Sequence, residues 1–283
     1  TYNLALLEEL PQKPFPLPQK ASHLVEHLAK KNNGKRILST IDNDLQNSVN
    51  ALVAKHHSVL EQNQVHNAAV VVMDVETRKV LAYVGNTNTS KDNQKDVDMV
   101  HANRSTGSTI KPLLYSAMLD AGELVPDMLV ADVPTQIAGY TPENFNESYS
   151  GAVTAKKALA RSLNIPAVRM LQSYGLQKFR DQLDFFNLKG INKPADHYGL
   201  TLILGGAEAS LWDLCKTYAA MASTVNHFNE TSSEYFSNEF TEPILFQNDK
   251  IDFGRKSTEK TAFDAASVYL TLEAMKEVNR PEG

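Results

Sequence analysis

Cysteine is nearly absent from this chain of 283 residues. The one cysteine, Cys215, lies in an apolar helical pattern, so a disulfide within the chain is impossible and a small buried hydrophobic side chain is expected there. The sequence also has no uninterrupted apolar run long enough to span a bilayer and no signal peptide at Thr1. Because the chain starts without Met, we expect a processed form or a fragment of a longer protein.

Positive charge is scarce as well. The formal net charge is −5 with neutral histidines, so no broad basic surface is expected, which argues against nucleic-acid binding. Hydrophobic residues make up 42% of the sequence, enough for one sizeable core, and no internal repeat is visible. The composition therefore indicates one globular domain, with a small accessory region at most.

The most informative stretch is residues 104–115. Gly107 precedes a serine, Lys111-Pro112 follows it, and apolar residues then recur at helical spacing. This pattern predicts a helix that starts near Ser108 and carries Pro112 in its first turn. Lys111 would then lie one turn after Ser108 on the same face of the helix. An amine in that position can take the proton of the hydroxyl, as a serine nucleophile requires.

A serine three residues before a lysine is common by chance. The chain has a second copy, Ser257 to Lys260, in a polar segment with no apolar run behind it. A solvated serine and a solvated lysine are the simpler interpretation of that copy. Ser108 differs because a glycine precedes it and a proline and a long apolar pattern follow it.

A second motif is formed by Ser162 and Asn164. Thr154 is predicted to cap a helix of residues 155–161, and Ile165-Pro166 is predicted to interrupt the regular backbone. Ser162 and Asn164 then fall at a helix end and turn. Short polar side chains at such a place can point into a cleft.

With the segments around them, these two motifs resemble the serine penicillin-binding transpeptidases, and in particular the class A bifunctional cell-wall synthases. The resemblance follows the family's order over nearly the whole chain. The further segments that carry it are Leu38–Asp42 with Leu45-Gln46, Val71–Asp74 with Val80–Gly85, Pro142–Phe145, and Leu204–Glu208.

The resemblance implies an α+β fold of the β-lactamase/transpeptidase type, with an antiparallel sheet flanked by helices that is incomplete in this chain. Its clearest β feature is a predicted hairpin of residues 68–73 and 79–84. Residues 1–35 would be a proline-rich linker that follows an absent glycosyltransferase domain. Residues 36–283 would be the transpeptidase domain, truncated at the C-terminus.

Periodicity and capping residues predict the other elements. They are a strand at residues 37–41, an amphipathic helix capped by Asp42 or Asn43, two helical pieces within 154–189, a helix from Ser210 to Ala222, and a last helix at 262–278. Residues 122–146 are predicted to be irregular.

By this resemblance, the activity is D,D-transpeptidation of peptidoglycan. Ser108 would attack the carbonyl between two terminal D-alanines of a stem peptide, and Lys111 would accept the proton. Ser162 would relay a proton to the departing amine, while Asn164 would fix the peptide and hold Lys111. A β-lactam would mimic the dipeptide and acylate Ser108.

The resemblance implies no cofactor and no metal. Expected partners are stem peptides, β-lactams and other cell-wall synthesis proteins, at the periplasmic face of the bacterial inner membrane, with the membrane anchor outside this chain. His23 and His27 are i,i+4 partners on a possible short helix. Because the sequence shows no third ligand nearby, two solvated histidines are expected.

Two other functions stay open at this level. One is a D,D-carboxypeptidase or β-lactamase-like hydrolase, in which Glu208 could act as a deacylating base, although ordering of its loop is the interpretation we favour. The other is a non-catalytic sensor or scaffold that binds peptidoglycan or β-lactam.

The family's third motif, Lys-Thr/Ser-Gly on a strand, is missing. The nearest match, Lys260-Thr261-Ala262, is rejected because Ala replaces Gly and the triplet is predicted to open a helix. The resemblance places the motif and three further strands after Gly283. We therefore expect the isolated chain to be inactive or weakly active.

Overall fold

The computed structural model of the chain describes residues 19–137 and 139–278. The apolar turn and the prolines of residues 1–18 lie outside this part. The helices are α2 (Ser22–Asn32), α3 (Asn43–Leu60), α4 (Lys111–Asp120), α5 (Ala155–Ala160), α6 (Asn164–Tyr174), α7 (Leu176–Phe185), α8 (Ala195–Tyr198), α9 (Leu211–Glu230) and α10 (Ala265–Lys276). The strands are β1 (Val70–Met73), β2 (Val80–Val84), β3 (Arg104–Ser105), β4 (Leu129–Asp132), β5 (Gly151–Thr154), β6 (Glu208–Ala209), β7 (Tyr235–Phe236) and β8 (Lys256–Ser257).

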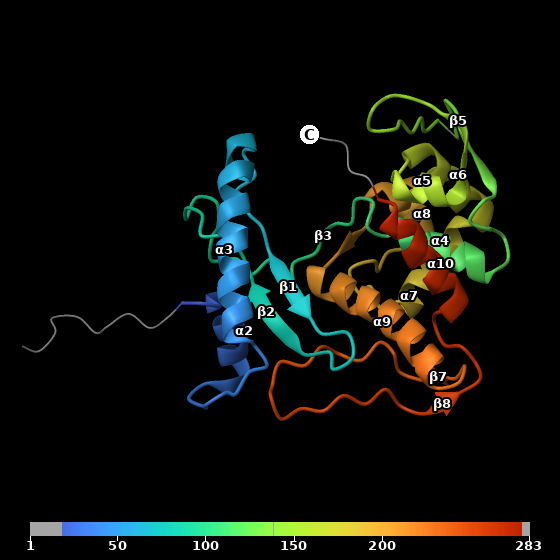
Figure 1. Cartoon of the computed structure of the whole chain (residues 1–283). Helices are drawn as coiled ribbons and strands as arrows, with labels where there is room; N and C mark the ends of the chain where they lie inside the picture. Colours follow the sequence, from blue (N-terminus) through green and yellow to red (C-terminus); the bar gives the residue numbers. More distant parts are fainter. Residues whose placement is uncertain (1–18, 138, 279–283) are drawn as a thin grey trace, which may run out of the picture.

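Two parts lie side by side in Figure 1. One is the β1–β2 hairpin with α2 and α3, and the other is a larger helical part that contains α4 to α10. Helix α9 contacts β1 and so joins the two parts. None of the helices in the described residues is both long and apolar enough to cross a membrane.

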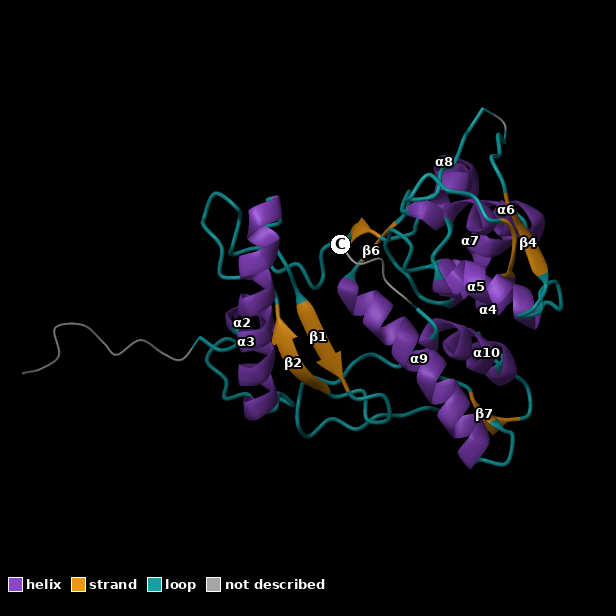
Figure 2. Ribbon diagram, turned by 45° about the horizontal axis from the view of Figure 1, so that its top comes forward, coloured by secondary structure: helices purple, strands orange, loops and turns teal. Residues whose placement is uncertain are grey.

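The β1–β2 hairpin confirms the clearest sequence prediction. Its strands are antiparallel, with Val70 opposite Val84. Helix α3 lies along the hairpin in Figure 2 and buries Val49 against Ala82 and Val84. The predicted cap of α3 is also confirmed, because Asp42 Oδ1 accepts hydrogen bonds from the first-turn N–H groups of α3.

Helix α2 packs on the same hairpin. Its Leu24 and Leu28 are buried in a cluster with Val80, Tyr83 and Val100. Burial of such a leucine contributes roughly 1.5–3 kcal/mol. The described part of the predicted linker is therefore docked on the sheet.

The strand predicted at residues 37–41 is reduced to a single bridge between Ser39 and Phe246. The chain changes partner here. Thr40 N donates to Leu245 O, whereas Asp42 N donates to Leu81 O in β2. Because the backbone of this segment does not pair with either neighbouring segment over several residues, a regular β-ladder does not form.

Residues 122–146 were predicted to be irregular, and this prediction is wrong in part. They contain β4, which pairs antiparallel with β5. Each strand has only four residues, and Pro126 and Pro134 flank β4, so the sequence pattern favoured a loop.

Residues 154–189 form three helices where two pieces were predicted. Gly175 separates α6 from α7, and the additional break, between α5 and α6, lies at Ser162, whose φ of 52° is left-handed. The predicted interruption at Ile165-Pro166 is wrong, because Pro166 lies in the first turn of α6. A proline is tolerated there since its missing N–H has no partner within the helix.

Helix α9 confirms its predicted cap and exceeds its predicted length. Ser210 Oγ accepts a hydrogen bond of 3.0 Å from Asp213 N. The helix continues past Ala222 to Glu230, since polar residues on its last turns are buried among polar partners. Ser223, for example, is 0% exposed and accepts a hydrogen bond from an arginine side chain.

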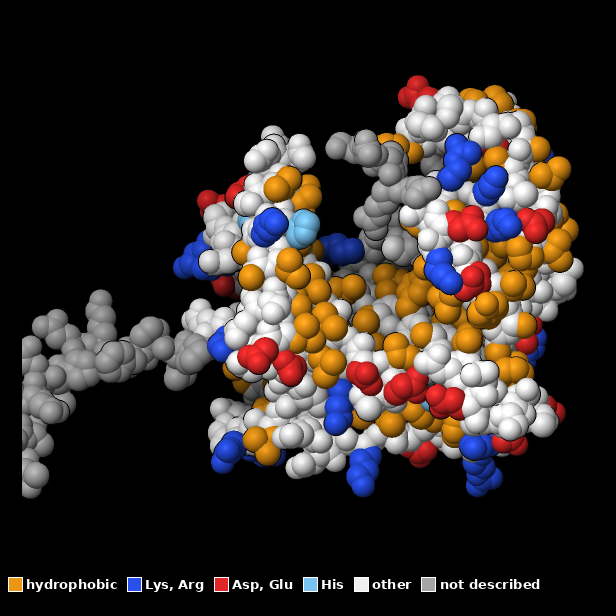
Figure 3. All heavy atoms as spheres, in the orientation of Figure 1, with side chains coloured by type: hydrophobic (Ala, Val, Ile, Leu, Met, Phe, Trp, Pro, Cys, Tyr) orange, Lys and Arg blue, Asp and Glu red, His pale blue; other side chains and the backbone are white. Residues whose placement is uncertain are grey.

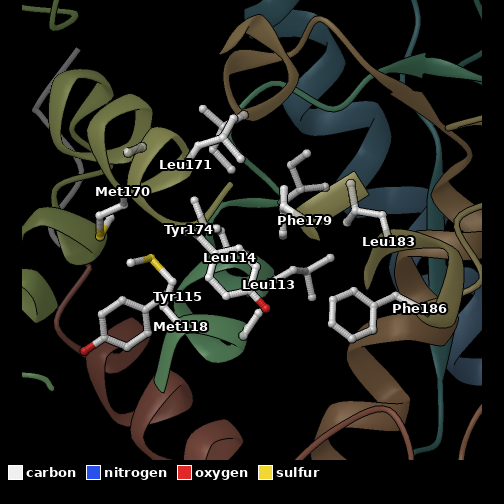
Figure 4. Packing of buried hydrophobic residues seen from close by; sticks show 14 of the residues in the cluster. Leu113, Leu114, Tyr115, Met118, Met170, Leu171, Tyr174, Phe179, Leu183 and Phe186 are labelled. Carbon is white, nitrogen blue, oxygen red and sulfur yellow. The ribbon is translucent and has the colours of Figure 1, made fainter. Parts of the chain in front are cut away.

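The main core surrounds α4. Figure 4 shows Leu113, Leu114, Tyr115 and Met118 of α4 packed among side chains of α6 and α7. The first three of these residues are at most 1% exposed. The core therefore fixes α4, and with it Lys111, the first residue of the helix.

The edge of β1 opposite β2 has no strand beside it in the described residues. Residues 70–73 are half-buried. Hydrophobic side chains gather on the face between the hairpin and the helical part in Figure 3. An apolar strand with a free edge is a place where further strands can add.

Arg78, in the turn of the hairpin, ties the two parts together. Its side chain is 0% exposed and donates to Ser223 Oγ at 2.6 Å and to Glu239 O at 2.9 Å. The Glu239 carboxylate, also buried, lies 3.7 Å from the guanidinium and accepts from His227. Arg78 thus compensates a buried carboxylate at the junction.

We predict that Arg78→Ala lowers the free energy of unfolding by about 3–5 kcal/mol, because Glu239 would stay buried without its cation. Arg255→Ala is the control, since Arg255 is exposed and its side chain makes no hydrogen bond in the described part; its effect should stay within about 0.5 kcal/mol. Denaturant unfolding measures both. Equal losses of unfolding free energy in the two variants would show that the buried Arg78–Glu239 network does not stabilise the protein.

Candidate active site

The amine of Lys111 is buried among oxygen acceptors at the start of α4. The residue is 4% exposed. Nζ lies 2.8 Å from Ser162 O, 2.7 Å from Asn164 Oδ1, and 3.3 Å from both Ser162 Oγ and Leu163 O. The structure therefore brings the lysine of the first motif against both polar side chains of the second.

No carboxylate is among the partners that the described residues offer to Lys111. Burial lowers the pKa of its amine from 10.5 to about 8, since a low-dielectric site disfavours the ammonium form. A lysine with such a pKa is partly neutral near pH 7, as a general base must be.

Ser108 lies three residues before α4, in a turn, so the predicted helix start is too early. Lys111 N donates to Ser108 O at 3.1 Å, which closes the turn. Ser108 is half-buried, and neither its Oγ nor its N–H makes a hydrogen bond within residues 19–137 and 139–278. A hydroxyl and an N–H at a turn remain free to meet a ligand. Catalytic hydrogen bonds that are long in unliganded enzymes commonly shorten once substrate binds.

The Ser162–Asn164 segment lies where the sequence predicts, at a helix end and turn. Ser162 is exposed in its left-handed conformation between α5 and α6, and Asn164 is the first residue of α6. This sharp turn aims the Ser162 carbonyl and the Asn164 side chain at the same amine. Asn164 Nδ2 also donates to Glu143 O at 2.8 Å.

Asn144 positions the second motif, a role that sequence reasoning missed. It is 3% exposed, and its Oδ1 accepts from Asn164 N at 3.0 Å and from Ile165 N at 3.3 Å. Its Nδ2 donates to the buried Asp132 at 2.7 Å. Asn144 thus satisfies free N–H groups at the start of α6. The only sequence signal was its place in the Pro142–Phe145 segment.

The turn that carries Ser108 rests on Gly205. Ser105 Oγ donates to Gly205 O at 2.8 Å, and Thr106 N donates to Ala207 O at 2.9 Å. Gly205 has a φ of 103°, and a Cβ built on it would lie 2.6 Å from Ser105 Oγ and 2.9 Å from Gly107 Cα. Only glycine fits under the turn at this position.

Glu208 is placed by its backbone. It pairs with Ser105 across the β3–β6 ladder, and its side chain is exposed and makes no hydrogen bond in the part of the chain that the structure describes. The backbone of Glu208 therefore takes part in holding this segment, while its side chain, which was expected to order the loop, makes no hydrogen bond there that would do so.

The copy of the first motif at Ser257 is not a site. Ser257 lies in β8, while Lys260 forms an ion pair with Asp120. Asp120 is the last residue of α4 and Lys111 the first, so Lys260 lies at the opposite end of that helix. Residues 260–262 belong to no strand, but the prediction that they open a helix is wrong, because α10 begins only at Ala265 after its cap Asp264.

We predict that Gly205→Ala destabilises the protein and slows acylation of Ser108, because the new methyl group collides with the turn. Gly122→Ala is a matched control, since Gly122 has a φ of 70° but no atom within 4 Å of its built Cβ. In the control, the free energy of unfolding should fall by only about 1–2 kcal/mol, the cost of a left-handed backbone for a residue with a Cβ. In Gly205→Ala it should fall by about 1–3 kcal/mol more, because of the collision, as measured by denaturant unfolding. Equal losses and unchanged acylation would contradict the tight contact.

Comparisons with known proteins identify the family and the fold of this chain. The profile of the Penicillin binding protein transpeptidase domain matches residues 68–279. Penicillin-binding protein 1C of Escherichia coli (strain K12) is 34% identical over 210 residues, which cover 74% of this chain and 27% of that protein. Penicillin-binding protein 1A of Neisseria cinerea is 30% identical over 172 residues, or 58% of this chain and 21% of that protein. The chain spans about a quarter of the length of these relatives.

Solved structures share the fold. The penicillin-binding protein PonA1 from Mycobacterium tuberculosis superposes with a TM-score of 0.66 at 21% identity, covering 91% of this chain and 67% of that chain. The transpeptidase domain of Burkholderia pseudomallei penicillin-binding protein 3 gives 0.64 at 20% identity, with coverages of 87% and 71%. These likenesses confirm the predicted α+β fold. Because the profile spans Ser108 and both residues of the second motif, the chain belongs to the penicillin-binding protein transpeptidase domain family.

Proposed function

We propose that this domain is the D,D-transpeptidase of a bifunctional peptidoglycan synthase, with Ser108 as its nucleophile. The observation that carries the proposal is the buried Lys111 amine, held by Ser162 and Asn164 and paired with no carboxylate of the described residues. A neutral amine next to a serine is the base that such a nucleophile needs. The expected setting is the periplasmic face of the inner membrane, with other cell-wall synthesis proteins as partners.

In the acylation step, Ser108 Oγ forms a bond to the carbonyl carbon between the two terminal D-alanines. Lys111 Nζ takes the hydroxyl proton. The C–N bond of the peptide then breaks, and the terminal D-alanine leaves as an amine after it receives a proton. Ser162 Oγ, 3.3 Å from Lys111 Nζ, is placed to pass that proton from the ammonium to the leaving group. An amine of a neighbouring stem peptide then attacks the ester carbonyl carbon, the bond from that carbon to Ser108 Oγ breaks, and Lys111 passes the amine's proton back to Ser108 Oγ.

Two features support the binding of the substrate. Asn164 Nδ2, which donates to Glu143 O, is a polar group next to the catalytic amine and can contact a peptide. The Ser108 N–H precedes α4, where the helix dipole favours negative charge, so it is one donor for the oxyanion. The second donor is expected on the strand that carries the third motif.

We predict that a fluorescent penicillin labels the full protein covalently at Ser108. Ser108→Ala should abolish labelling, because Ser108 is the proposed nucleophile, whereas the neighbouring hydroxyls of Ser105 and Thr109 donate to backbone carbonyls. Ser257→Ala, which changes the second Ser-x-x-Lys copy, should leave it intact. Gel fluorescence and mass spectrometry of the labelled peptide measure this. Labelling that survives Ser108→Ala would disprove the nucleophile assignment.

We predict that the acylation rate rises about tenfold per pH unit below the Lys111 pKa of about 8 and levels off above it, because only the neutral amine can accept a proton. Lys111→Arg and Ser162→Ala should each slow acylation by about 10²–10⁴ without unfolding the protein. Lys157→Arg, an exposed exchange on α5, is the control. A rate that is flat between pH 6 and about 9 would rule out Lys111 as the base.

We also propose that strands from outside the described residues complete the sheet at the free edge of β1 in the full protein. We predict that residues 1–283 expressed alone aggregate or melt without cooperativity and acylate poorly, because that edge and its apolar face stay uncovered. Light scattering and thermal melts measure this against the full protein. A monomeric, cooperatively melting 1–283 protein with normal acylation would contradict the proposal.

A further inference from the structure

We propose that His27, Asp98 and His101 bind one divalent transition-metal ion. One ligand atom from each residue lies within 4.8 Å of the others. His27 is on α2, whereas Asp98 and His101 belong to the strap, which we define as residues 98–103, leading into β3. The two histidines of α2 were expected to be solvated, but in the structure each has its own neighbours. His23 Nε2 lies 2.8 Å from Lys95 O, whereas His27 lies beside Asp98 and His101.

The two imidazoles face each other without polar partners. The rings of His27 and His101 are stacked, with centroids 4.5 Å apart and an interplanar angle of 16°. Neither ring forms a hydrogen bond or an ion pair with any of the described residues. The nitrogens of both rings are thus available to a metal ion.

The carboxylate of Asp98 is held in a fixed orientation. The Tyr83 hydroxyl donates to Oδ2 at 2.6 Å, and Val100 N donates to Oδ1 at 3.1 Å. Tyr83 is 0% exposed. Each carboxylate oxygen accepts only one of these bonds and keeps a lone pair. Hydrogen bonds of this kind commonly orient metal-binding carboxylates.

Packing on both sides positions the ligands. The indole of Trp212, at the start of α9, lies 4.9 Å from the His101 ring, and Trp212 N donates to Val100 O at 3.1 Å. Helix α2 is anchored by Leu24 and Leu28 on the sheet. The strap and α2 are therefore brought together by contacts that need no metal.

Two imidazole nitrogens and one carboxylate oxygen suit Zn²⁺, with water as the fourth ligand, whereas Mg²⁺ and Ca²⁺ prefer oxygen ligands. Ligand atoms about 2.0–2.1 Å from a tetrahedral zinc ion lie roughly 3.4 Å apart, so side-chain rotations close the site. The strap runs through β3 to the turn of Ser108. A bound metal would thus fasten α2 to the segment that precedes the nucleophile.

The test uses the full protein, stripped with a chelator and titrated with Zn²⁺ by calorimetry and with Co²⁺ by visible absorption. Since other parts of the full protein can bind metal, the variants are compared with the wild type. His27→Gln and His101→Gln should each remove one bound ion per chain. Tyr83→Phe should weaken the same site by about 10–100-fold. His56→Gln, an exposed exchange on α3, should change nothing.

Zn²⁺ should also raise the melting temperature of the wild type and of His56→Gln, but not of His27→Gln. The proposal is overturned if the wild type binds no Zn²⁺, or if His27→Gln and His101→Gln keep the wild-type stoichiometry. If His101→Gln does not fold, the Zn²⁺ stoichiometry of His27→Gln alone decides whether the proposal holds.

Discussion

The site depends on the burial of one amine without a counter-charge. A second lysine shows what the alternative looks like. Lys216, 0% exposed, has the carboxylate of Glu242 at 2.8 Å and that of Asp213 at 3.8 Å. Within the described residues, the hydrogen-bond partners of Lys111 are carbonyl, hydroxyl and amide oxygens alone. The two buried lysines therefore differ in their surroundings, since one is paired with carboxylates and the other is held by neutral oxygens as a candidate base.

Holding a neutral amine in place requires acceptors that are themselves fixed. The chain supplies them through Asn144, which links the buried Asp132 of β4 to the first N–H groups of α6. A buried network of this kind is stable only when each member is satisfied. The turn that carries Ser108 is fixed separately, by the close approach of Gly205. The core around α4 then fixes the position of this turn relative to the acceptors around Lys111.

Sequence patterns predicted the elements with strong local signals. The valine-rich hairpin, the caps at Asp42 and Ser210, and the turn before Asn164 were found because their residues act on near neighbours in the chain. The short β4–β5 pair and the role of Asn144 were missed, since both depend on partners brought together only by the fold. The helix start near Ser108 was placed too early because a turn closed by Lys111 N has the same residue pattern as a first helical turn.

The proposed role of Lys111 requires a largely neutral amine at slightly alkaline pH. Its most direct test is a pH titration of the Lys111 side chain by NMR in protein labelled at lysine, with Lys111→Arg used to assign the signal. We expect a midpoint of about 8, well below the 10.5 of an ordinary lysine. A midpoint at or above that ordinary value would mean that the amine stays charged and that Lys111 is not the base.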